Sequence, residues 1–233
     1  MTTAILQARM SSSRLPGKVL MPLLGQPMIL RQIERLRRCR ELDRIVVATS
    51  EDPSDDVLAE TLAGAGVEVV RGPLDDVLGR FLKVIEVLDL TGDMVRLTAD
   101  CPLADPDVID ACIAFRREGD LDYASNGRRR TYPRGLDVEA FRVEALKQAG
   151  RETQAPYDRE HVTPWLYRPG SAFIQGDLVQ SKDESPLRWT VDFPSDYEFV
   201  RQVYEALYPK NPAFTSDDIR DLPITWREID VET

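Results

Sequence analysis

Residues 4–18 read Ala-Ile-Leu-Gln-Ala-Arg-Met-Ser-Ser-Ser-Arg-Leu-Pro-Gly-Lys, and the apolar stretch at 4–8 predicts a strand. A loop rich in cations and hydroxyl groups follows this strand. Residues 27–40 then place apolar side chains at helical spacing, which predicts an amphipathic helix. A strand, a loop and a helix in this order form the first unit of an α/β fold.

Apolar runs and amphipathic segments keep alternating through the first half of the chain. This alternation is typical of a parallel sheet with helices on its faces. Further strands are expected at 44–49, 67–70, 93–98 and 121–124, and further helices at 54–65, 75–90 and 105–118. We therefore predict a doubly wound α/β core with a mostly parallel sheet.

The pattern changes at about residue 127, after which the expected elements become shorter. Strands are expected at 137–141, 172–175 and 187–191, and helices at 143–150 and 157–167. Ser195 with Glu198 predicts a capping box that opens a helix through residue 207, and Thr215 with Asp218 predicts another. We expect a single domain over 1–233, in which a core at 1–126 is joined to an extension at 127–233.

The composition argues against several classes of protein. A net charge of −10 is not typical of a nucleic-acid-binding surface, which normally carries a basic excess. No run approaches the roughly 20 apolar residues of a membrane span, and the N-terminus lacks a signal-peptide pattern. Three cysteines without zinc-type spacing indicate reduced thiols. We expect a cytoplasmic protein that acts on a small substrate, with no nucleic-acid and no membrane partner.

The loop after the first strand has the composition of a phosphate-binding segment. Ligands of open parallel sheets bind beyond the carboxyl ends of the strands, which is where this loop is expected. It combines cations, hydroxyls and a flexible backbone, supplied by Arg9, Ser11, Ser12, Ser13, Arg14, Gly17 and Lys18. Such a loop can surround a polyphosphate. The alternative is a set of solvated charges around a plain Pro-Gly turn.

Two better-known phosphate motifs do not fit this chain. A P-loop needs an upstream glycine and a Ser or Thr after its Gly-Lys, whereas Val19 follows Lys18. A dinucleotide fingerprint should open a helix, whereas 64–66, Gly-Ala-Gly, leads into the expected strand at 67–70. The loop is therefore a phosphate-binding candidate of another type.

Residues 9–18, R-M-S-S-S-R-L-P-G-K, resemble the R-x-x-S-x-R-L-P-x-K signature of cytidylyltransferases, which include the CMP-Kdo and CMP-acylneuraminate synthetases. The resemblance continues through 22–28 and extends over nearly the whole chain, which is similar to the spore-coat polysaccharide biosynthesis protein F group. It implies a three-layer, Rossmann-like sandwich of the nucleotide-diphospho-sugar transferase type. It also implies CTP and an acidic sugar as substrates, a CMP-sugar as product, and a homodimer.

The same resemblance implies which residues hold CTP. The backbone of the loop with Arg9, Ser13, Arg14 and Lys18 is expected to hold the phosphates, and Ala8 is expected near the base. The full set of expected nucleotide contacts is Gln7, Ala8, Arg9, Met10, Ser11, Ser13, Arg14, Lys18, Arg71, Asp76 and Thr98. For Asp76, a plain first-turn role on a helix is an equal alternative. Arg9, Arg14 and Lys18 are expected to assist catalysis with Asp100.

Two aspartates are expected to bind Mg²⁺, which would neutralise charge between the triphosphate and the attacking nucleophile. Asp100 follows the expected strand at 93–98, and Asp192 follows the one at 187–191. Both match positions at which enzymes similar to CMP-Kdo synthetase coordinate the metal. Each could alternatively cap a turn before a nearby proline.

Four residues of the second half are expected to contact the sugar. Asp137 and Glu139 alternate on one face of an expected strand and suit sugar hydroxyls, although an exposed edge strand would look the same. Arg134 and the arginines at 128–130 form a basic patch that could receive a carboxylate or could be merely solvated. His161, the only histidine, is expected near the sugar without being assigned as a base.

Two alternative functions stay open. A nucleotide-sugar-dependent glycosyltransferase of related fold would use an Asp-x-Asp metal motif, and Asp105 with Asp107 has that spacing. Helix capping explains that pair more simply. A non-catalytic nucleotide-binding relative is the second alternative. The acceptor is also open among Kdo, a sialic-acid-like nonulosonate, another sugar acid and a phosphonate.

Overall fold

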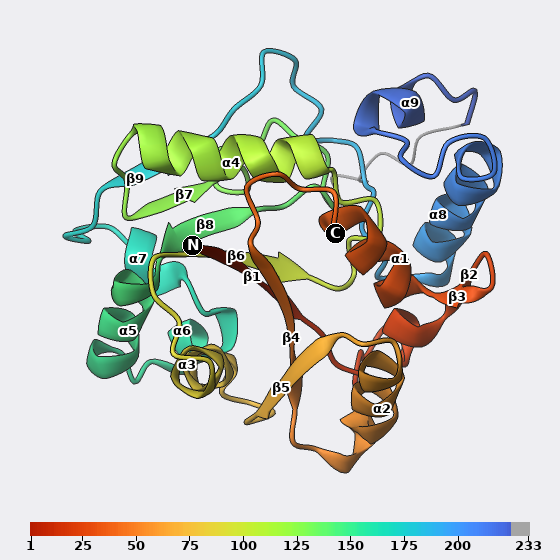
Figure 1. The fold of residues 1–233 in the computed structure, drawn as a ribbon. Coiled ribbons are helices and arrows are strands. Elements are labelled where there is room, and N and C mark those ends of the chain that lie inside the picture. Colours follow the sequence, from red (N-terminus) through yellow and green to blue (C-terminus); the bar gives the residue numbers. More distant parts are fainter. Residues whose placement is uncertain (225–233) are drawn as a thin grey trace.

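A seven-stranded sheet in the order β5-β4-β1-β6-β8-β7-β9 runs through the computed structural model, which describes residues 1–224 (Figure 1). The end of the expected extension, 225–233, lies outside the described residues. The strands are β1 (Thr2–Gln7), β4 (Arg44–Ser50), β5 (Glu68–Gly72), β6 (Asp93–Thr98), β7 (Tyr123–Ser125), β8 (Glu139–Arg142) and β9 (Gln175–Asp177). Neighbouring strands pair in parallel except where β8 pairs with β6 and β7. The mostly parallel sheet predicted from the sequence is confirmed.

Helices cover both faces of this sheet, which gives three layers (Figure 1). One face packs against α1 (Met28–Leu36), α2 (Asp56–Gly64) and α4 (Pro106–Glu118). The other packs against α3 (Val77–Val87), α5 (Val143–Glu152) and α7 (Pro164–Tyr167), and α6 (Pro156–His161) contacts α3. A third apolar cluster joins α8 (Pro194–Leu207) and α9 (Ser216–Arg220) to the hairpin of β2 (Pro22–Leu23) and β3 (Gln26–Pro27).

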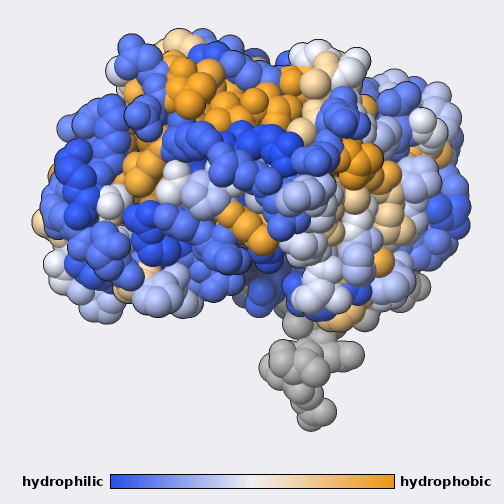
Figure 2. All heavy atoms as spheres, turned by 90° about the horizontal axis from the view of Figure 1, so that it is seen from below, coloured by the Kyte–Doolittle hydropathy of each residue, from blue (hydrophilic) through white to orange (hydrophobic). Residues whose placement is uncertain are grey.

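Strand β1 shows why the central strands read as continuous apolar runs. Ala4 and Leu6 belong to the core on one face of the sheet, and Ile5 belongs to the core on the other. A strand that is covered on both faces needs apolar side chains at every position. None of the helices within residues 1–224 combines the length and the apolarity that a bilayer crossing requires. Hydrophilic side chains dominate the face shown in Figure 2, apart from a band of apolar ones.

Three local predictions for the second half are wrong. The helix expected at 157–167 is divided into α6 and α7, because Val162 adopts a positive φ of 73° just before Pro164. The strand expected at 187–191 is not a regular strand, although Arg188 forms an isolated bridge with Arg134. Helix α8 begins at Pro194, and the Asp196 carboxylate, not Glu198, accepts the backbone N–H of Phe193. The capping box of Thr215 and Asp218 at α9 is confirmed.

Candidate active site

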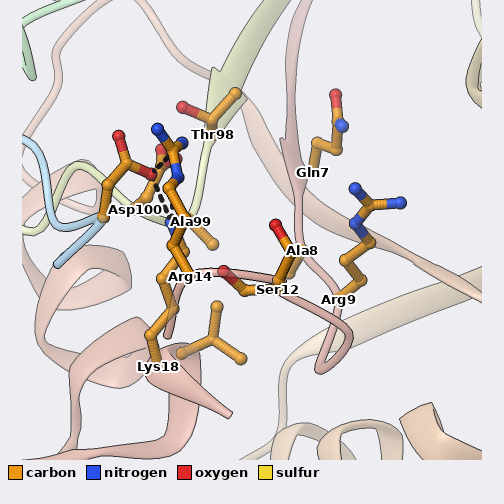
Figure 3. A pocket seen from close by; sticks show the side chains of 12 residues that line it. Gln7, Ala8, Arg9, Ser12, Arg14, Lys18, Thr98, Ala99 and Asp100 are labelled. Atoms are coloured by element: carbon orange, nitrogen blue, oxygen red, sulfur yellow. Dashed lines mark hydrogen bonds and ion pairs between the residues drawn. The ribbon is translucent and has the colours of Figure 1, made fainter. Parts of the chain in front are cut away.

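The carboxyl ends of β1 and β6 open into a pocket of about 210 Å³ (Figure 3). Its walls come from the loop after β1, from the end of β6 and from the segment before α8. The lining residues are Gln7, Ala8, Arg9, Ser12, Ser13, Arg14, Lys18, Val19, Thr98, Ala99, Asp100 and Asp192. Most of the predicted phosphate and metal residues therefore line one cavity.

A buried carboxylate anchors the start of the loop. Asp55 is fully buried, and its Oδ1 accepts the backbone N–H of Met10 at 2.6 Å. Its Oδ2 accepts the hydroxyl of Thr49 at 3.0 Å and both the N–H and the hydroxyl of Ser50. Asp55 thus ties the loop to the end of β4. Sequence reasoning missed this residue, because its partners come from two separate strand ends.

Within the loop, the backbone turns back on Met10, whose carbonyl accepts the N–H groups of Ser12 and Gly17, both at 2.9 Å. Gly17 has a φ of 70°, which glycine adopts without strain. It leads into the short 3-10 helix η1 (Lys18–Leu20). Among the described residues, the N–H groups of Ser13 and Arg14 have no acceptor. They are available, with the exposed side chains of Arg9 and Arg14, to bind an anion.

The ammonium group of Lys18 lies between the two predicted metal ligands, Asp100 and Asp192. Figure 3 shows Lys18 and Asp100 in the same pocket. Its Nζ donates to Asp100 Oδ2 at 3.2 Å, to Asp192 Oδ1 at 3.0 Å and to the carbonyl of Val191 at 2.7 Å. The Lys18 side chain is only 9% exposed. The two carboxylates, which are far apart in the sequence, therefore face the same point.

Asp192 has two further cationic partners. Its Oδ1 also pairs with Arg14 at 2.9 Å, and its Oδ2 pairs with Arg188 at 2.6 Å. Burial acts to raise the pKa of Asp192, but Lys18, Arg188 and Arg14 outweigh it, so that the pKa lies below its ordinary value. The Asp192 carboxyl is thus held in its charged form.

The donor set suits a hard divalent cation, because both facing groups are carboxylates. No group of three or more His, Cys, Asp or Glu side chains that could hold a metal occurs within residues 1–224. Asp100 and Asp192 could therefore supply only part of a coordination sphere. The remaining ligands of such an ion would be phosphate oxygens and water.

A second and larger pocket, of about 590 Å³, shares Thr98 with the first. It is lined by Arg96, Thr98, Tyr123, Ser125, Gly127, Arg128, Asp137, Glu139, Tyr157, His161, Thr163 and Tyr167. A smaller pocket that contains Gln7, Arg9, Arg96 and His161 lies against both. Asp137, Glu139 and His161, which were predicted to contact the sugar, all line this second pocket. The His161 ring contacts the Tyr157 ring at a tilt of 56°, with 4.4 Å between the ring centroids.

A largely buried polar network surrounds Glu139 in this second pocket. The Glu139 carboxylate accepts the hydroxyls of Tyr123, at 2.7 Å, and of Thr163, and it pairs with Arg96. Arg96 also donates to Gln7 Oε1 at 3.2 Å, so it links the two pockets. Burial and the Glu139 carboxylate raise the pKa of Tyr123 well above its ordinary value. Sequence reasoning missed Arg96. A charged residue between the apolar neighbours Val95 and Leu97 of an expected strand could have indicated it.

Five expected contacts lie outside both pockets. One of them, Met10, packs against the apolar core. Arg71 donates to the carbonyls of Ser50 and Asp52 and pairs with Asp56. Asp76 is the N-cap of α3, one position before the first turn that its alternative role predicted, and it pairs with Arg159. The side chains of Ser11 and Arg134 are exposed and do not line either pocket, whereas Ser12 does.

The Asp-x-Asp pair of the glycosyltransferase alternative is occupied by structural contacts. Asp105 is buried and caps α4 by accepting the N–H of Asp107 at 2.9 Å. Its second oxygen accepts the N–H of Ser216 at 2.6 Å. Asp107 pairs with Arg40 on the surface. Both carboxylates are therefore explained by capping and surface pairing.

Comparison with known proteins gives a consistent result. The cytidylyltransferase family model matches residues 3–215. Spore coat polysaccharide biosynthesis protein SpsF of Bacillus subtilis is 34% identical over 217 residues, which cover 86% of this chain and 85% of that protein. The 3-deoxy-manno-octulosonate cytidylyltransferase of Syntrophotalea carbinolica is 40% identical over 114 residues, 48% of this chain and 44% of that protein.

A solved structure extends the similarity to three dimensions. A cytidylyltransferase from Leptospira borgpetersenii superposes with a TM-score of 0.87 at 30% sequence identity. The superposition covers 94% of this chain and 92% of that one. The sequence signature, the strand-end loop with its two carboxylates, and the family match over most of the chain agree. The chain is therefore a nucleotidyltransferase that belongs to the cytidylyltransferase family.

Proposed function

We propose that the chain uses CTP to activate an acidic sugar, giving a CMP-sugar and pyrophosphate for the synthesis of cell-surface polysaccharide. The observation that carries this proposal is the position of the cationic loop. It faces Asp100 and Asp192 across a pocket that continues, at Thr98, into a larger one. Two adjoining pockets at one strand end suit a reaction that joins a nucleotide to a second substrate. The relatives that activate 3-deoxy-manno-octulosonate support the choice of a sugar acid.

The reaction needs charge neutralisation and precise positioning more than it needs covalent help from the protein. A sugar hydroxyl attacks the α-phosphorus, the new O–P bond forms, the bond to the β-phosphate oxygen breaks, and pyrophosphate and the hydroxyl proton leave. Arg9 and Arg14 are exposed at the mouth of the pocket and would bind the triphosphate. Mg²⁺ held by Asp100 and Asp192 would screen the negative charge that repels the nucleophile.

The larger pocket has the features of an acceptor site. Tyrosine rings supply flat surfaces for a sugar, and Asp137 and Glu139 supply oxygens in its lining. Arg128, which lies over the Tyr167 ring at 5.4 Å, brings a cation to the same pocket. A carboxylate on the sugar would find this guanidinium within the pocket. We propose that the enzyme works in the cytoplasm as a homodimer.

The proposal is tested by measuring pyrophosphate release from each of the four nucleoside triphosphates with a panel of sugar acids. CTP with one acidic sugar is expected to give turnover. Asp100→Ala is expected to reduce kcat/KM by at least about a hundredfold, because a charge-stabilising group is lost. Asp107→Ala is the matched control and is expected to keep wild-type turnover, since Asp107 lies on the surface.

Other results would replace the proposal. Release of a nucleoside diphosphate from a nucleotide sugar would indicate a glycosyltransferase. Binding of CTP without turnover of any sugar acid would indicate a non-catalytic relative. Near-wild-type pyrophosphate release by Asp100→Ala would remove Asp100 from the metal site.

A further inference from the structure

Lys18 is placed where the divalent cation is proposed to bind. An ammonium group has three N–H donors, and those of Lys18 are directed to Asp100, Asp192 and the carbonyl of Val191. In this position Lys18 has no N–H left for a phosphate. A role for Lys18 in phosphate binding therefore requires its ammonium group to leave the two carboxylates.

The charges around Lys18 are balanced as they stand. The cluster contains three cations, Lys18, Arg14 and Arg188, and three carboxylates, Asp100, Asp192 and Asp196. A divalent cation added to this neutral cluster would leave it with an excess of two positive charges. A cation that arrives with a triphosphate brings more negative than positive charge with it, so the same excess does not arise.

We propose that the Lys18 ammonium group and the divalent cation compete for the same oxygens of Asp100 and Asp192. Lys18 blocks the metal until the nucleotide brings it. The incoming triphosphate then offers Lys18 a new anionic partner, so the ammonium group moves from the carboxylates to the phosphates. This inference rests on the metal role proposed for the two aspartates.

The local structure allows such a movement. The backbone of Lys18 is fixed, because its N–H donates to the Leu15 carbonyl and Val19 beside it is buried. Its side chain is a flexible four-carbon stem that carries a point charge. The pocket that contains Lys18 also contains Ser12, Ser13 and Arg14. The ammonium group can therefore change partners by rotation within the side chain, without a change in the fold.

The test is a titration of the full-length protein with Mn²⁺ alone. The electron paramagnetic resonance signal of free Mn²⁺ measures how much of the ion is bound. Lys18→Met removes the competing charge and is expected to bind Mn²⁺ at least about tenfold more tightly than wild type. Lys18→Gln keeps a donor for the Val191 carbonyl, so it tests the same gain if Lys18→Met does not fold. Lys83→Met, which removes an ammonium group paired with Glu51 on the surface, is expected to leave the affinity unchanged.

A second variant shows whether the gained affinity belongs to this site. Adding Asp100→Asn to Lys18→Met is expected to abolish the gain. Unchanged or weaker Mn²⁺ binding in both Lys18 variants overturns the proposal, and so does a gain that survives Asp100→Asn. Neither nucleotide nor sugar is present, so a failure of CTP turnover leaves this result standing. Absence of competition likewise leaves the proposed CTP reaction standing.

Discussion

At the scale of single residues, Asp192 is the most heavily paired carboxylate of the candidate active site. Lys18 and Arg14 share its Oδ1, and Arg188 occupies its Oδ2. Arg188 also pairs with Asp196, whose Oδ2 accepts the backbone N–H of Asp192 at 2.9 Å. The side chain and the backbone of Asp192 are thus held from both sides. This pairing fixes the orientation of the carboxylate before any ligand arrives.

The lowered pKa of Asp192 predicts a pH-dependent contribution to stability. A carboxyl whose pKa is lower in the folded state stabilises the fold at pH values above its unfolded pKa, which is about 4. This contribution disappears as the pH falls through the pKa of the folded state. Asp192→Asn is therefore expected to lower the free energy of unfolding by about 1–3 kcal/mol at pH 7 and by less at pH 3. Urea unfolding at both pH values measures the difference.

Asp107→Asn is the matched control for this pH dependence, because the Asp107 side chain is 67% exposed. It is expected to leave the free energy of unfolding close to wild type at both pH values. An effect of Asp192→Asn that has the same size at pH 7 and pH 3 would show that the charge of Asp192 does not contribute to folding.

At the scale of elements, the loop after β1 owes its shape to a residue outside it. Asp55 lies at the end of the 3-10 helix η2 (Pro53–Asp55), between β4 and α2, and its carboxylate receives donors from both β4 and the loop. Because Asp55 is fully buried, its negative charge is compensated by these hydrogen bonds. The first residues of the loop after β1 are thus positioned by the end of the neighbouring strand, β4.

Asp55→Asn is expected to lower the free energy of unfolding by about 2–4 kcal/mol, because the amide NH₂ group faces donors that need an acceptor. It is also expected to raise the KM for CTP, since the start of the loop loses its anchor. Urea unfolding and steady-state kinetics measure the two effects. Asp52→Asn changes a neighbouring half-buried carboxyl that caps η2, a role that asparagine can keep, and is expected to leave the KM for CTP unchanged. A wild-type KM in Asp55→Asn would contradict the anchoring role.

The strands of the first half were predictable because burial on both faces imposes a strong apolar pattern. Residues 187–191 show the same kind of pattern, yet they do not form a strand, because their backbone partners are the loop residues Arg134 and Asp100. The strand-end rule correctly placed Asp100 beside the loop, and Asp192 also lies there although the segment before it is not a strand. Asp55, Arg96 and Arg188 were missed, because each acts through contacts with residues that the sequence does not mark as neighbours.

At the scale of the whole molecule, one sheet crosses the boundary expected near residue 127. β8 lies between β6 and β7, so a strand of the second half separates two strands of the first. The other partner of β7 is β9, also from the second half. Asp192 likewise comes from the second half to complete the carboxylate pair with Asp100. The sequence pattern predicts strands but not their order in the sheet.

This strand order predicts that a fragment of residues 1–126 does not fold cooperatively. Without β8, one edge of β6 loses its backbone partners, and without β8 and β9 the short strand β7 has no pairing at all. The apolar face that packs against α5 and α7 would also be exposed. Urea unfolding of the fragment, monitored by circular dichroism, is expected to show no cooperative transition. The full chain is expected to show one. A cooperative transition in the fragment would mean that the first half is an independent domain to which the elements of the second half have been added.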